Sequence, residues 1–91
     1  MSVDVRIPTM LRTHTEGQAM LRVEGTNVSE VVRALIAQFP GLESNLLDTE
    51  GGLHRFVNVY VNDEDIRYLD GLSTPVEDGA ELTILPAVAG G

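Results

Sequence analysis

The fold is decided by residues 27–41, which read NVSEVVRALIAQFPG. The apolar residues of this stretch share one helical face and are Val28, Val31, Val32, Leu35, Ile36 and Phe39. This spacing predicts an amphipathic helix. Asn27 is a good N-cap and Glu30 stands three residues later, as in a capping box. Pro40 and Gly41 end the helix. Because its apolar residues share one face, the helix has a single apolar face to bury.

Strand-like alternation appears on both sides of this helix. Residues 3–7 and 19–23 alternate before it, and a polar connection over residues 12–18 joins these two runs into a hairpin. Residues 57–61 and 81–85 alternate after it. Because one helix covers only one face of a sheet, we expect the valine, leucine and isoleucine rows of these runs to face the helix.

The remaining segments predict turns and short elements. Residues 42–48 favour a short helical turn, and residues 48–52, with two glycines, favour a loop. Residues 62–65 predict a turn and residues 66–68 a short edge strand. The expected structure is an α+β domain in the order strand, strand, helix, strand, short strand, strand, with a mixed four- to five-stranded sheet and one main helix on one face.

The chain ends in the thin segment Leu85-Pro86-Ala87-Val88-Ala89-Gly90-Gly91. Proline cannot donate to a strand ladder and commonly marks the end of a strand. We therefore expect a domain over residues 1–86 and a flexible, poorly ordered tail over residues 87–91, which offers little to bury. Two interpretations stay open: a frayed chain end, or an arm whose free carboxylate enters a narrow tunnel in a partner.

Composition restricts the function further. Ninety-one residues make one domain, and no basic-then-apolar signal or membrane-length apolar run is present, so we expect a cytoplasmic protein. The absence of cysteine excludes disulfides, thiolate metal sites and a cysteine nucleophile. A net charge of −8 disfavours nucleic acid and anionic membrane and favours a basic protein partner. Lysine is absent, either through compositional bias or because a chain activated at its C-terminus gains from lacking amines.

Other polar residues give no sign of a metal or phosphate site. His14 and His54 lie in expected loops without ligand spacing. The acids at 63–65 lack the spacing and glycine of a calcium loop. Gly51 and Gly52 lack the lysine and flanking pattern of a phosphate loop. We expect surface histidines, a solvated acidic turn and no metal.

Two segments carry a specific resemblance: residues 55–67, RFVNVYVNDEDIR, and residues 84–91, ILPAVAGG. Together with the order of elements, they resemble the MoaD/ThiS family of ubiquitin-like sulfur-carrier proteins, whose fold is the β-grasp. The similarity covers essentially the whole chain. Within the family it is greatest to the carriers that serve cysteine biosynthesis, whereas typical ThiS proteins are shorter and lack residues 42–54.

The resemblance implies a protein co-substrate and not an enzyme. A ubiquitin-activating-type adenylyltransferase/sulfurtransferase would use ATP to adenylate the carboxylate of Gly91 and convert it into a thiocarboxylate. A PLP-dependent cysteine synthase would accept the sulfur, and a zinc-dependent peptidase would release the cysteine. No cofactor would be bound by the chain itself. The residues inserted in partner active sites would be Ala87, Val88, Ala89 and Gly90.

Phe56 and Leu85 are expected on the sheet face opposite the helix, where they would form an exposed apolar patch that docks a partner. Two other functions fit the same tail. The chain could be the small subunit of molybdopterin synthase, or a ubiquitin-like modifier that is conjugated through Gly91.

Overall fold

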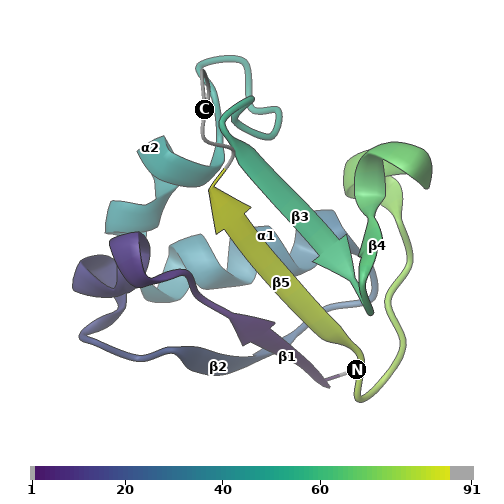
Figure 1. Ribbon diagram of the computed structural model, residues 1–91, viewed down its shortest axis with the longest axis horizontal. Helices are drawn as coiled ribbons and strands as arrows, with labels where there is room; N and C mark the ends of the chain where they lie inside the picture. Colours follow the sequence, from purple (N-terminus) through teal and green to yellow (C-terminus); the bar gives the residue numbers. More distant parts are fainter. Residues whose placement is uncertain (1, 87–91) are drawn as a thin grey trace.

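The computed structural model describes residues 2–86 as a five-stranded sheet with one long helix across a face (Figure 1). The strands are β1 (Ser2–Arg6), β2 (Met20–Glu24), β3 (Val57–Val61), β4 (Glu64–Asp65) and β5 (Glu81–Pro86). The helices are α1 (Val28–Gln38) and α2 (Glu43–Leu46). The sheet order is β2-β1-β5-β3-β4, in which only β1 and β5 are parallel neighbours. The predicted α+β architecture, with a mixed sheet, is confirmed.

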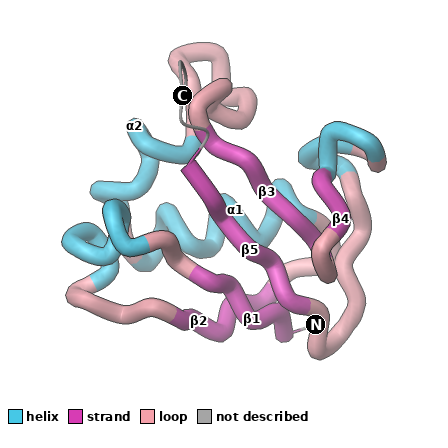
Figure 2. Tube along the Cα trace, in the orientation of Figure 1, coloured by secondary structure: helices cyan, strands magenta, loops and turns pink. Residues whose placement is uncertain are grey.

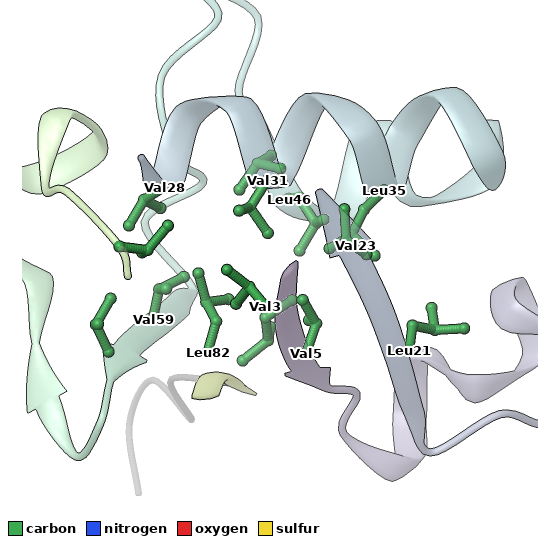
Figure 3. Close-up of a cluster of buried hydrophobic side chains, with 14 of the residues drawn as sticks. Val3, Val5, Leu21, Val23, Val28, Val31, Leu35, Leu46, Val59 and Leu82 are labelled. Carbon is green, nitrogen blue, oxygen red and sulfur yellow. The ribbon is translucent and has the colours of Figure 1, made fainter. Parts of the chain in front are cut away.

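The core lies between α1 and the inner face of the sheet (Figure 3). Because side chains alternate along each strand, the apolar residues of the strands lie on this face. The predicted apolar face of α1 packs against them. The core residues that are fully buried or nearly so include Val3, Val5, Leu21, Val23, Val28, Val31, Leu35, Leu46, Val59 and Leu82. Ile36 and Phe39 are partly buried against this cluster. Among residues 2–86, no helix has both the length and the apolar character needed to cross a bilayer.

The start of α1 is fixed by reciprocal capping. The Asn27 side chain accepts a hydrogen bond from the Glu30 N–H at 2.9 Å, as predicted. The Glu30 carboxylate reaches one residue further back than in a standard capping box. It accepts hydrogen bonds from the N–H and the hydroxyl of Thr26, both at 2.8 Å. The Asn27 bond satisfies a donor that the first helical turn leaves without a partner, and the Glu30 bonds fix Thr26 just before the N-cap.

We expect the stabilising effect of the Glu30 carboxylate to disappear in acid. Hydrogen bonds from the backbone and side chain of Thr26 hold the pKa of Glu30 below its ordinary value. A carboxyl group with a lowered folded-state pKa stabilises the fold above its unfolded pKa, and this contribution is lost as the pH falls through the folded pKa. Urea unfolding of the wild type and of Glu30→Gln should therefore differ at neutral pH, and the difference should disappear as the pH falls through the lowered pKa of Glu30. A difference that persists unchanged in acid would contradict this assignment.

The connection between β1 and β2 differs from the expected polar loop, because Thr9–Thr15 forms a 3-10 helix. Two of its own residues, Leu11 and Thr15, are buried. The Thr15 hydroxyl donates to the carbonyl oxygen of Gln18 at 2.9 Å, and Arg12 Nε donates to that of Ile7 at 3.1 Å. A short 3-10 segment offers too few residues for a helical period, so alternation and helical spacing both miss it.

The predicted edge strand at residues 66–68 was wrong (Figure 2). The edge strand is β4 at Glu64–Asp65, and Ile66–Tyr68 forms a 3-10 turn. Asn62 and Asp63 both adopt left-handed backbone angles, with φ of 49° and 73°. Such a pair makes a two-residue hairpin turn, so the chain resumes pairing earlier than expected. The predicted helical turn near residues 42–48 is confirmed by α2 and the 3-10 turn Pro40–Leu42 before it.

Candidate functional site

The position where the chain leaves the sheet is set by β5. This strand lies in the centre of the sheet, parallel to β1 and antiparallel to β3. Its last residue, Pro86, pairs with Val57 at the start of β3. Pro86 is also the last residue that the structure describes. The expected tail, Ala87 to Gly91, lies outside the described residues.

Leu85 occupies the place that the alternation predicts for it. Leu82 and Ile84 are buried beneath α1, whereas Leu85 is 43% exposed on the opposite face. Its cross-strand neighbour on β3 is Asn58. The Asn58 Oδ1 atom is buried and has no hydrogen-bond partner among residues 2–86. An apolar side chain and a vacant acceptor therefore lie together close to the chain exit.

Two pairs of oppositely charged side chains lie elsewhere on this outer face. Arg6 lies 3.3 Å from the Glu81 carboxylate, and Arg22 lies 3.2 Å from that of Asp4. Solvent-exposed pairs of this kind contribute little to stability. They leave Leu85 as the apolar feature of β5 on this face.

Phe56 is exposed as expected but does not lie in the outer-face row. It precedes β3 in a turn and is 42% exposed. Its N–H donates to His54 Nδ1 at 3.2 Å, and the Arg55 guanidinium lies 5.1 Å from its ring centroid. Phe56 lines a hollow beside inner-face residues of β3 and β5. The expectation of one patch of Phe56 and Leu85 on the outer face therefore fails for Phe56, because β3 begins only at Val57.

This hollow, which we call the exit hollow, has a volume of about 130 Å³. Four separate parts of the chain contribute to it: the 3-10 helix after β1, helix α2, the turn before β3 that carries His54 and Phe56, and the adjoining ends of β3 and β5. Its lining residues are Met10, Leu11, Ser44, Asn45, His54, Phe56, Val57, Ile84 and Pro86. No sequence motif indicated a role for Met10 or Ser44. The signal that could have pointed to this hollow is the apolar Met10, which stands just before the polar connection over residues 12–18 and is 64% exposed in the structure.

The acidic turn at residues 62–65 is a structural element. Asp65 accepts hydrogen bonds from the backbone and the guanidinium of Arg67, the shortest at 2.8 Å. These bonds hold the pKa of Asp65 below its ordinary value and raise that of Arg67. Within residues 2–86 no group of three or more histidine, aspartate or glutamate side chains is arranged to hold a metal ion.

The fold and the central exit strand define a small ubiquitin-like β-grasp protein. Residues 5–91 match the model of the ThiS family, and the chain belongs to this family. It is 50% identical to the sulfur carrier protein CysO of Mycobacterium tuberculosis, with both chains covered completely. It is 34% identical to a putative sulfur carrier protein of Archaeoglobus fulgidus, again over both full lengths.

A solved structure supports the same relationship. The chain is similar to one in the crystal structure of the Amycolatopsis orientalis BexX/CysO complex, with a TM-score of 0.90 and 50% identity. The match covers 98% of this chain and 99% of the other. The predicted family and fold are therefore confirmed.

Proposed function

We propose that this chain is a sulfur carrier protein that supplies sulfide for cysteine biosynthesis. The observation that carries the proposal is the 50% identity to CysO carriers over the complete length of both chains. The relatives are carriers and not catalysts, so the chain is a co-substrate of other enzymes. The chemistry is assigned to the carboxylate of Gly91.

A free carboxylate is a poor electrophile, because its negative charge repels nucleophiles and oxide is a bad leaving group. Attack of the Gly91 carboxylate on the α-phosphorus of ATP forms an acyl adenylate and releases pyrophosphate. A sulfide-level donor then attacks the carbonyl carbon, and AMP departs with the electron pair of the broken C–O bond. The product is a thiocarboxylate, which is anionic at neutral pH and is itself a sulfur nucleophile.

The partners follow from this sequence of steps. An adenylyltransferase of the ubiquitin-activating type performs the activation. A cysteine synthase that carries pyridoxal phosphate accepts the sulfur, and a zinc-dependent peptidase releases the cysteine. A CysO relative has been crystallised in a complex with BexX, which supports docking of such carriers on partner proteins. Ala87, Val88, Ala89 and Gly90 have small or absent side chains and suit a narrow partner tunnel.

The test is reconstitution with the purified activating enzyme and cysteine synthase from the same organism. With ATP and labelled sulfide, the label should appear first on the chain and then in cysteine attached to Gly91. Label transferred to a molybdopterin precursor would assign the chain to molybdopterin synthase. Recovery of Gly91 in isopeptide linkage to lysines of other proteins would assign it to the modifiers. Either result would overturn the proposal.

We expect Leu85→Ala to weaken the binding of the activating enzyme without unfolding the domain. Truncating one of the few side chains that dominate an interface costs about 1 kcal/mol or more, which is roughly a fivefold loss of affinity or greater. Because Leu85 is 43% exposed, the thermal midpoint should hardly move. Titration calorimetry and a melting curve check the two parts. Unchanged affinity would remove Leu85 from the interface.

A further inference from the structure

The exit hollow lies where any partner that holds Gly91 has to approach. Pro86 forms part of its wall, and Gly91, to which the proposed function assigns the chemistry, lies five positions after Pro86. Five residues extend over about 17 Å at most. An enzyme that holds the last carboxylate therefore has its surface within that distance of the hollow.

The lining of the exit hollow suits an apolar side chain. Met10 and Phe56, 64% and 42% exposed, form its open rim, whereas buried Ile84 and Leu11 form its deeper wall. Methionine adapts to the shape of an incoming group, and phenylalanine and methionine are both enriched in protein–protein interfaces. Hydrogen bonding to His54 and the nearby Arg55 guanidinium favour one arrangement of the Phe56 turn.

An acidic groove adjoins the exit hollow and shares Ser44 and His54 with it. We define the acidic groove by Glu43, Ser44, Leu47, Asp48, Thr49 and His54. Asp48 Oδ1 accepts hydrogen bonds from the N–H groups of Glu50 and Gly52, at 2.8 and 2.9 Å, which fix its carboxylate in place. The Glu43 carboxylate has no hydrogen bond or ion pair to another residue within 2–86.

We propose that the exit hollow and the acidic groove together dock the activating enzyme. The occupant is a segment of that enzyme in which an apolar side chain enters the hollow and an adjacent arginine or lysine lies against Glu43. The inference rests on the proposed function and on two matches between the surfaces. The apolar rim of the hollow matches an apolar side chain of the enzyme, and the acidic groove matches a basic residue of the enzyme. The net charge of −8 favours the same basic partner.

The experiment compares two variants with two matched controls. Glu43→Arg reverses the charge of the groove, and Ser44→Trp places a large ring at the exposed edge of the hollow. Glu77→Arg and Ser73→Trp make the same changes at exposed positions that line neither feature. Calorimetry gives the Kd for the purified activating enzyme, and pyrophosphate release gives kcat.

We expect both test variants to raise Kd about tenfold, with kcat at saturation unchanged because Gly91 is intact. The controls should stay within about twofold of wild type. Added salt should reduce the Glu43→Arg effect but not that of Ser44→Trp, because only the former is an exposed charge interaction.

Several results would overturn the proposal. Test variants that bind like their controls, while the wild type is activated normally, would remove the docking site and leave the proposed function standing. Failure of the enzyme to activate the wild type would remove both. A dimer in sedimentation that Ser44→Trp breaks would assign the hollow to a second copy. Tighter binding by Ser44→Trp would assign it to residues 87–91 of this chain.

Discussion

Deletion of Gly91 is expected to abolish ATP-dependent activation and leave the stability of the domain unchanged. An adenylation site holds one carboxylate against one phosphate, and displacement of a reacting group by an ångström costs about a hundredfold in rate. Loss of a residue moves the carboxylate by about 3.5 Å, so activation should fall below detection. Adding one residue after Gly91 should have the same effect.

The matched control adds one residue at the amino terminus, which changes the length but not the carboxyl end. Pyrophosphate release in the presence of the activating enzyme measures activation, and thermal melting measures stability. Activation that survives a deleted or extended carboxyl terminus would place the function elsewhere and end the carrier account.

Leu82→Ala is expected to cause the largest loss of stability among single truncations on β5. Leu82 is completely buried and pairs with Val5 on one side and Val61 on the other. Replacing a buried leucine by alanine costs about 2–5 kcal/mol, from lost apolar burial and the cavity that remains. For a domain of this size the melting temperature should fall by roughly 8 °C or more.

Leu85→Ala is the control, three residues further along the same strand. Because Leu85 faces solvent on the opposite side of the sheet, its truncation should change the free energy of unfolding by about 0.5 kcal/mol or less. Urea unfolding of the two variants separates the effects. Equal losses would mean that the strand register is shifted by one residue, since such a shift exchanges the two faces.

The long periodic elements could be predicted from the sequence because each depends on its own residues. About three turns of apolar spacing and the Asn27 cap locate α1, and valine alternation locates β3. The short elements depend on local backbone geometry. The left-handed angles of Asn62 and Asp63 place β4 at Glu64–Asp65. Such backbone angles cannot be predicted from the spacing of apolar residues.

The candidate site divides in the same way. Leu85 could be placed because β5 alternates up to its end, and Gly91 was singled out by its position and by family resemblance. Phe56 could not be placed, because the residue at which β3 begins decides whether it joins the outer face. The exit hollow could not be foreseen at all, since Met10, Ser44 and Pro86 come together only after the chain has folded.

The intact mass of the protein purified from the organism that makes it tests the central claim most directly. The account predicts a population that is heavier than the sequence mass by the difference between a sulfur and an oxygen atom, with fragmentation placing the change at Gly91. A second population that carries one additional cysteine residue after Gly91 is expected where the cysteine synthase is active. A protein found only at its unmodified mass, or modified at a site other than Gly91, would contradict the account.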